Sequence, residues 1–139
     1  MDIRPCGSEP SRLAPPQYFT GTVWQDPIIE APLPPEDVRA TLVRFDPGAR
    51  TNWHTHPAGQ TLYIMSGIGR VQSEGGKVRQ VRAGDVVWFP PNTRHWHGAS
   101  PVAGMVHIAI TGVRGGKFVD WMEKVTDEQY NPQPADKPK

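Results

Sequence analysis

Turn-forming residues recur along almost the whole chain and leave little room for long helices. The 139 residues include 16 Pro and 14 Gly, and turns that contain them follow one another about every 6–12 residues. Pro and Gly both disfavour helix interiors, whereas the short segments between these turns are rich in β-branched and aromatic residues. This pattern predicts an all-β chain folded as an antiparallel sandwich or barrel.

The segments between the turns define the expected strands. Residues 26–36 contain four prolines, so we expect an irregular crossing segment there. Gly67 and Gly69 are expected to bracket a turn or bulge, and residues 74–77 to form a hairpin turn. The predicted strands cover residues 19–24, 38–45, 50–56, 60–65, 70–73, 78–82, 86–89, 94–98 and 105–111.

The period of the apolar residues changes near the C-terminus. Phe118, Trp121, Met122 and Val125 fall at helical spacing and predict one apolar face of a short helix packed on the barrel. Residues 126–129 have the spacing of a capping box for a last helical turn. We therefore expect a flexible leader over 1–17, one domain over 18–130 and a disordered tail over 131–139.

Composition excludes several classes of function. The net charge is +1 with mixed signs, so neither a nucleic-acid-binding stripe nor an acidic tail is indicated. Residues 1–17 hold no apolar run that would form a secretory signal, and no segment approaches the ~20 apolar residues of a membrane span. We expect a cytoplasmic protein without a membrane or nucleic-acid partner. The single Cys6 is interpreted as incidental.

Histidine is concentrated in the predicted strands. The chain contains two His-x-His pairs, His54 with His56 and His95 with His97, and a fifth histidine at His107. Residues two apart on an extended chain project from the same face. Two such pairs brought together in a barrel would present four imidazoles to one interior, an arrangement that indicates a metal site.

The spacing of these pairs resembles the two motifs of the cupin superfamily. Five residues separate Gly48 from His54, and four separate Pro90 from His95. Gln60 stands where the family usually has Glu, and Asn92 replaces a Gly, a change that a left-handed turn tolerates. The resemblance implies an all-β cupin barrel (a double-stranded β-helix or jelly roll) with a short C-terminal helix. It also implies that His54, His56, Gln60 and His95 are the metal ligands.

Further segments are similar to the small bacterial cupins that include manganese-dependent hydroxynitrile lyases. They include 46–51, 84–89, 95–99 and 120–123. This group has three His and a Gln as ligands, so Gln60 agrees with it. The likeness implies cleavage of a cyanohydrin to an aldehyde or ketone plus hydrogen cyanide, and the reverse addition. It favours one Mn(II) per chain, while the ligand types also suit Fe(II), Zn(II), Co(II) or Ni(II).

The histidines outside the ligand set are candidates for the general base. His97 is expected to share a face with His95, and His107 to face the same cavity from a separate strand. Imidazole titrates near neutrality, so either His107 or His97 is suited to remove the hydroxyl proton. The alternative is that they only orient neighbouring groups. Strand alternation adds the expected pocket lining of Thr41, Val43, Leu62, Ile64 and Thr111.

Two other functions fit the same ligand set. One is an iron-dependent cupin dioxygenase that consumes oxygen, and the other is a non-catalytic module in which a metal anchors a small ligand. Oxygen uptake would identify the first, and tight binding without turnover the second. The number of strand edges and tryptophans also predicts assembly as a homodimer or homotetramer.

Overall fold

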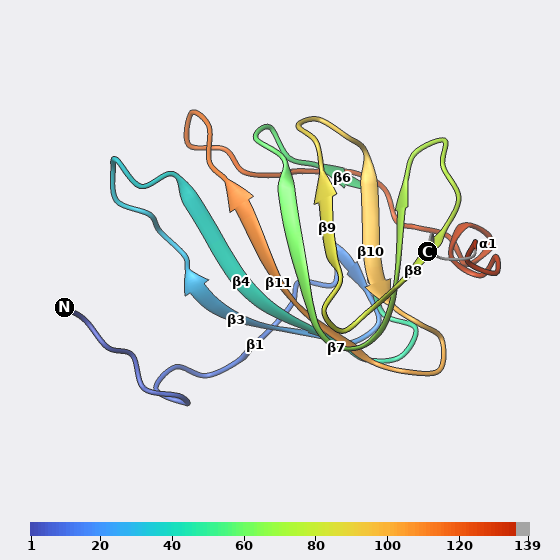
Figure 1. The fold of residues 1–139 in the computed structure, drawn as a ribbon, viewed down its shortest axis with the longest axis horizontal. Coiled ribbons are helices and arrows are strands. Elements are labelled where there is room, and N and C mark those ends of the chain that lie inside the picture. The colour runs from blue at the N-terminus through green and yellow to red at the C-terminus, as the bar shows by residue number, and fades with distance from the viewer. Residues whose placement is uncertain (136–139) are drawn as a thin grey trace.

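The computed structural model describes residues 1–135, and nearly all of its regular structure is β (Figure 1). The prediction of an all-β cupin fold with one short C-terminal helix is confirmed. The elements are β1 (Arg12–Leu13), β2 (Phe19–Thr20), β3 (Val23–Ile29), β4 (Val38–Phe45), β5 (Arg50–Thr51), β6 (His54–Thr55), β7 (Gln60–Ser73), β8 (Arg79–Arg82), β9 (Val86–Phe89), β10 (His95–Ala99), β11 (Met105–Gly112), β12 (Asp120–Trp121) and α1 (Asp127–Tyr130).

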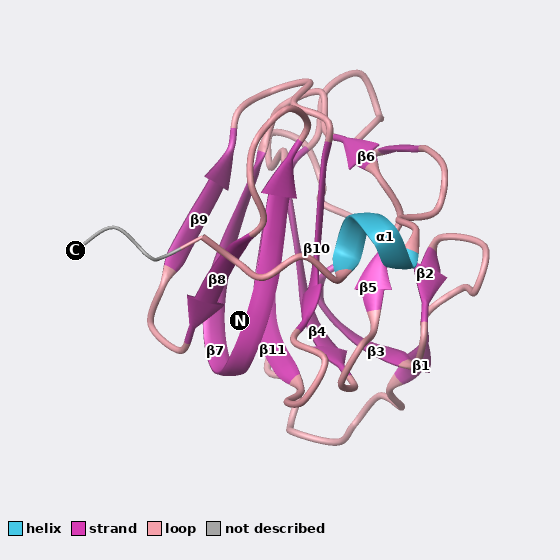
Figure 2. Cartoon of the chain, turned by 90° about the vertical axis from the view of Figure 1, so that its right-hand side faces the viewer, coloured by secondary structure: helices cyan, strands magenta, loops and turns pink. Residues whose placement is uncertain are grey.

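The strands form one sheet that curls upon itself into a half-barrel (Figures 1 and 2). Its order is β1-β3-β4-β11-β7-β10-β5-β2, and all the pairs between these strands are antiparallel. The long strand β7 belongs to both sides of the curl. Its first half pairs with β9 and β11, and its second half pairs with β8 and β10.

Side-chain alternation assigns one face of this sheet to the core. Leu62 and Ile64 on β7 and Phe89 on β9 are buried in the main apolar cluster, and the outward Trp88 is 64% exposed. Adjacent residues on a strand point to opposite faces, so Phe89 lines the interior and Trp88 does not. A second, smaller cluster brings Trp96 against Tyr130 of α1, which lies beside β10 (Figure 2).

The first predicted strand is wrong in its limits. Gly21, at a φ of 79°, divides residues 19–24 into β2 and the start of β3. β3 then continues through Pro27 to Ile29, into the segment expected to be irregular. Pro27 is tolerated because the pairing of β3 with β4 shifts register between Pro27 and Ile29, and because β1 covers only the earlier part of β3.

The short C-terminal helix begins later than its apolar pattern predicts, because the residues with helical spacing are not helical. Residues 120–121 form β12, which pairs with β6, and Trp53 exchanges backbone hydrogen bonds with Met122 and Glu123. Of the apolar side chains at helical spacing, Val125 is buried, Phe118 and Trp121 are partly buried, and Met122 is exposed. The helix begins only after Thr126, whose hydroxyl accepts from the Gln129 amide while the Gln129 side chain accepts from the Thr126 amide. The predicted capping box is confirmed.

Two turns and one crossing of strands depend on positive φ angles. Asn92 adopts a φ of 59°, as expected for a residue in a position usually held by Gly. Gly75 supplies the positive φ of the hairpin turn, at 80°. Gly67 does not end a strand, since β7 runs through it. A Cβ at Gly67 would lie 1.9 Å from the Gly104 carbonyl oxygen, so this crossing of strands requires glycine.

The terminal segments lie on the surface of the sheet. Residues 12–13 of the expected leader form β1 against β3, and Ala135 makes a parallel bridge to Arg79 on β8. The predicted disorder over 131–139 falls partly on residues 136–139, which lie outside the described residues. Within residues 1–135, no helix is long and apolar enough to cross a membrane.

Candidate metal centre

The curl of the sheet brings all five histidines to one end of the barrel interior. His54 lies on β6 and His56 just after it, His95 and His97 lie on β10, and His107 lies on β11. All five side chains are buried. The rings of the three predicted histidine ligands are close together, with centroids 4.3 Å apart for His54–His95, 4.9 Å for His54–His56 and 5.3 Å for His56–His95. The ring of His97 is also near, at 5.2 Å from that of His54.

Three of these rings are held by the main chain in the same way. In each, Nδ1 lies within hydrogen-bond distance of a carbonyl oxygen: His54 with Asn52 (2.9 Å), His56 with Phe118 (2.6 Å) and His95 with Thr93 (2.8 Å). A carbonyl oxygen can only accept, so Nδ1 carries the proton. Each neutral ring therefore presents the lone pair of Nε2 to the interior, which is the form of histidine that binds metals.

Gln60 adds an oxygen to this cluster. Its amide nitrogen donates to the Thr111 hydroxyl at 3.1 Å, which turns its Oε1 towards Nε2 of His95 at 3.4 Å. Both of these facing atoms are acceptors. Burial lowers the pKa of His95 to about 3, so a proton does not separate them at neutral pH. A bound cation resolves this conflict, and the donor set therefore fits a metal ion.

The imidazole nitrogens support the same conclusion. Among the described residues, Nε2 of His56 is buried without a hydrogen-bond partner. One ring nitrogen from each of His54, His95 and His97 lies within 4.8 Å of the others. This three-histidine cluster indicates a single metal site in the cupin fold. His54 and His95 belong both to it and to the predicted ligand set, while His97 differs from His56 in lacking a carbonyl partner for Nδ1.

His97 and His107 are instead paired with each other. Nε2 of His107 lies 3.1 Å from Nδ1 of His97, and the outer nitrogens of both rings are buried without partners among the described residues. Burial lowers the pKa of His107 to about 3, and burial together with repulsion between the protonated rings of His97 and His107 lowers the pKa of His97 well below its usual range. Both rings are neutral at pH 7. One proton occupies their shared contact, so one outer nitrogen is always an acceptor and the other a donor.

A cavity of about 270 Å³ opens onto these residues. Its lining includes His54, His56, Gln60, His97 and His107, and it also includes three of the residues expected from strand alternation, Thr41, Val43 and Thr111. Leu62 and Ile64 do not line it; they are fully buried in the core. The cavity lies over β4 and β11, and β7 contributes only Gln60, so the inward side chains further along β7 pack beneath the site.

The walls of the cavity include aromatic residues that the sequence analysis did not assign to the site. Trp121 stacks on Tyr18 with ring centroids 4.8 Å apart and also contacts His54 at 4.7 Å. Phe118 lines the cavity and supplies the carbonyl acceptor of His56. Tyr18 follows the expected leader and Trp121 was expected in a helix, so only the fold reveals that they meet.

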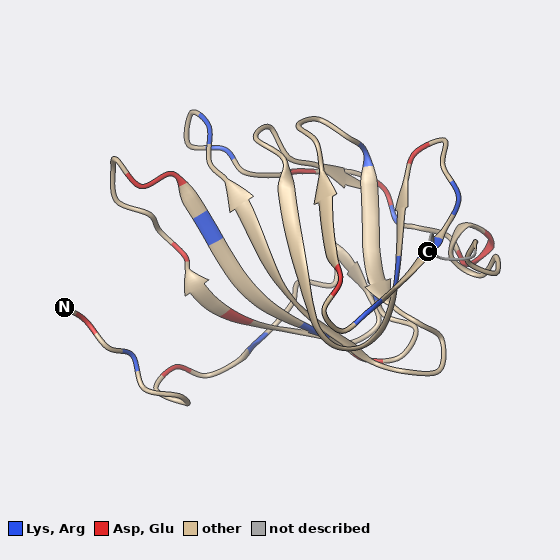
Figure 3. Cartoon of the chain, viewed as in Figure 1, with Lys and Arg blue, Asp and Glu red and all other residues tan. Residues whose placement is uncertain are grey.

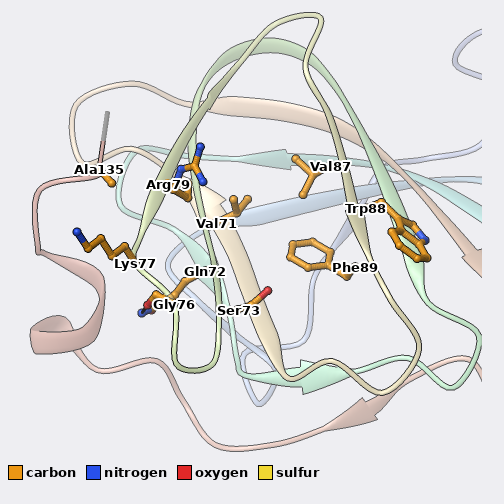
Figure 4. A pocket seen from close by; sticks show the side chains of 10 residues that line it. All are labelled: Val71, Gln72, Ser73, Gly76, Lys77, Arg79, Val87, Trp88, Phe89 and Ala135. Carbon is orange, nitrogen blue, oxygen red and sulfur yellow. Dashed lines mark hydrogen bonds between the residues drawn. The ribbon is translucent and has the colours of Figure 1, made fainter. Parts of the chain in front are cut away.

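Phe89 separates the cluster from a surface groove. Its ring stacks on His95 with centroids 3.7 Å apart and planes inclined by 12°. The same residue lines an open groove between β8 and β9, together with Val71, Val87 and Trp88 (Figure 4). Phe89 thus keeps His95 away from this side of the barrel.

Comparison with known proteins identifies the family. The cupin domain model matches residues 41–108. An (R)-mandelonitrile lyase of Granulicella tundricola is 54% identical over 130 residues, which cover 94% of this chain and 98% of that protein. The crystal structure of a cupin-like protein from Thermotoga maritima matches with a TM-score of 0.83 and 38% identity, covering 94% of this chain and 96% of that one. The polyketide cyclase RemF from Streptomyces resistomycificus shares the fold alone, with a TM-score of 0.72 and 14% identity over 94% of this chain and 91% of that one. The chain therefore belongs to the cupin family, and within it resembles the cupin hydroxynitrile lyases.

Proposed function

We propose that this protein is a metal-dependent lyase that cleaves cyanohydrins to an aldehyde or ketone plus hydrogen cyanide, and catalyses the reverse addition. The observation that carries the proposal is the neutral His97–His107 pair, which lines the same cavity as the unpartnered imidazole of His56. The near full-length similarity to an (R)-mandelonitrile lyase supports this choice among cupin activities.

His54, His56, Gln60 and His95 are the proposed metal ligands. We assign His56 rather than His97 because the Nδ1 proton of His56 is held by a carbonyl, whereas Nδ1 of His97 is occupied by His107. Three imidazoles and an amide add no negative charge, so a bound divalent ion would act as a strong Lewis acid towards the cyanohydrin oxygen. We favour Mn(II) from the likeness to the manganese-dependent hydroxynitrile lyases.

The histidine pair would move the proton. Its accepting outer nitrogen takes the hydroxyl proton as the C–C bond breaks, the C–O bond becomes a carbonyl, and the bonding electrons leave with cyanide. The donating outer nitrogen returns a proton to cyanide, which departs as hydrogen cyanide. The proton within the His97–His107 contact then shifts from the ring that gained a proton to the ring that lost one, so both rings are neutral again with the roles of their outer nitrogens exchanged. His107 is our preferred base, in the tautomer whose outer nitrogen accepts, because it lies on β11 and not on β10, the strand of the proposed ligand His95.

One experiment separates the candidate functions. Purified protein is analysed for metals and assayed for mandelonitrile cleavage under nitrogen and under air. Equal cleavage in both atmospheres, with about one transition metal per chain, supports the lyase. Oxygen uptake with an enol or catechol, without cleavage, would assign a dioxygenase. Tight ligand binding without any turnover would assign a binding module.

We also propose that the protein assembles as a homodimer or homotetramer through the outer face of the sheet. Val86 and Trp88 on β9 and Tyr63 and Met65 on β7 are exposed on this face, together with Ile110 on β11. The strands β9 and β11 carry no charged residue (Figure 3), so a second apolar copy of the same face fits it. Sedimentation should show wild-type oligomers and a Trp88→Asp monomer. A wild-type monomer at micromolar concentration would contradict the proposal.

A further inference from the structure

The lining of the cavity contains one charged side chain among the described residues. Among the described residues that line it, Arg39 is the only one with a formal charge at neutral pH, since the histidines are neutral and no carboxylate faces the interior. The remaining lining consists of aromatic, aliphatic and neutral polar side chains. A cation in a cavity whose lining contains no carboxylate creates a positive potential that favours negatively charged ligands.

Arg39 is placed at one end of an inward-facing row on β4. Arg39, Thr41 and Val43 alternate with outward residues and all line the cavity. Val43 is paired with His107 on β11, and Arg39 is paired with Thr111. Val43 is four residues along the strand from Arg39, a distance of about 13 Å between their backbones. The guanidinium and the catalytic pair therefore face a bound molecule from opposite ends.

The guanidinium group of Arg39 is held by an aromatic ring rather than by an acid. Its central carbon lies 3.8 Å from the centre of the Phe118 ring, a cation–π contact. Glu30 influences it electrostatically, but the Glu30 carboxylate is bound by Arg12, at 3.2 Å for one of the two contacts. Within the described residues Arg39 has no ion pair or hydrogen bond to a carboxylate. Its planar donors remain available to a ligand carboxylate.

We propose that Arg39 is a specificity-determining residue that binds a carboxylate on the substrate, so that the preferred substrates are aryl cyanohydrins that carry an anionic group remote from the reacting carbon. The aromatic walls formed by Tyr18, Phe118 and Trp121 suit the aryl ring. The reaction named here rests on the proposed lyase function, whereas the binding of an aryl carboxylate does not.

The kinetic test compares two substrates that differ only in this charge. The cyanohydrins of benzaldehyde and of 4-carboxybenzaldehyde are assayed with wild-type protein, Arg39→Gln and Arg39→Lys. We expect wild type to prefer the carboxylated substrate. Arg39→Gln should raise the KM for the carboxylated substrate about 10- to 100-fold, which is the contribution of a charge-assisted hydrogen bond. The kcat for that substrate, and both kcat and KM for the neutral substrate, should stay close to the wild-type values, and Arg39→Lys should recover part of the lost affinity for the carboxylated substrate.

The matched control is Arg44→Gln, on the same strand but outside the cavity, where Arg44 contacts Ser11 and Asp26. It should leave both substrates unaffected. An equal loss for both substrates in Arg39→Gln would show a structural role and overturn the proposal. So would a wild-type protein without preference for the carboxylated substrate.

A binding measurement distinguishes this inference from the lyase proposal. Calorimetry with benzoate and with benzyl alcohol is carried out on metal-loaded wild type and Arg39→Gln. Benzoate should bind wild type more tightly than benzyl alcohol does. The affinity for benzoate should fall at least 10-fold in Arg39→Gln and should weaken as the salt concentration rises. Benzoate binding that depends on Arg39 without cyanohydrin cleavage would refute the lyase and retain the carboxylate site. Benzoate binding that is indifferent to Arg39 would refute the carboxylate site, whatever the outcome for cleavage.

Discussion

The histidines of this cupin fall into two groups that are held in different ways. His54, His56 and His95 each place Nδ1 against a main-chain carbonyl, whereas His97 and His107 place ring nitrogens against each other. A carbonyl fixes the position of the proton, so the first group has a single tautomer with Nε2 free. A contact between two imidazoles leaves the proton free to move between them. The first arrangement suits metal coordination, and the second suits proton transfer.

The largest expected effect tests the first group. His56→Ala removes a ring whose Nε2 lacks a partner among the described residues, and leaves a coordination position vacant. We expect the metal content of the purified variant to fall from about one ion per chain to a small fraction of that. His107→Ala is the matched control, and its metal content should equal that of wild type. A His56→Ala protein with full metal content would show that the two groups do not differ in this way.

The second prediction concerns His97 and His107, the proposed catalytic pair. His107→Ala and His97→Ala should each retain metal, and the loss of the acting base should slow cyanohydrin cleavage about 100- to 10,000-fold. Steady-state rates are compared at equal metal content. His107→Asn keeps a polar group in place and serves as a control for packing. Full activity in both alanine variants would remove imidazole from the mechanism.

A smaller loss of metal affinity is expected from changing a residue that hydrogen-bonds to a proposed ligand. Thr111→Val preserves shape but removes the hydroxyl that accepts from the Gln60 amide, so Gln60 loses the contact that orients its Oε1. Outer partners of this kind are typically worth about 10- to 100-fold in metal affinity or activity, and we expect the lower end. Competition with a chelator measures the affinity. Thr41→Val, at another cavity-lining threonine, should leave it unchanged.

Periodicity and spacing predict the strands well, and they also anticipate which histidines gather at one end of the barrel. They fail where contacts depend on segments distant in sequence. Phe118, Trp121 and Val125 have helical spacing, yet Phe118 lines the cavity, Trp121 stacks on Tyr18 and Val125 is buried in the second cluster, because β12 is held by β6. The burial of Leu62 and Ile64 beneath the site likewise depends on the curvature of the sheet, which a single sequence does not encode locally.

The carbonyl acceptors show a further limit of sequence reasoning. Asn52 and Thr93 act through their main-chain oxygens, so their side chains give no indication of this role. The same holds for Phe118, which is 62 residues from its partner His56. A residue type can be recognised in a sequence, but a backbone oxygen is common to all residues. Only the path of the chain determines which of them meets a ring.

The position of β7 has a consequence for how the protein folds. Gln60 begins this strand, His95 lies on β10, which pairs with its second half, and His54 lies on β6, which pairs with β10. The proposed ligands therefore meet only after both sides of the curl have formed, and such distant pairings form slowly, on a scale of about milliseconds to seconds. Metal cannot be captured by an early, partly formed sheet. It should leave the folding rate almost unchanged and instead slow unfolding, which makes the bound ion a source of kinetic stability.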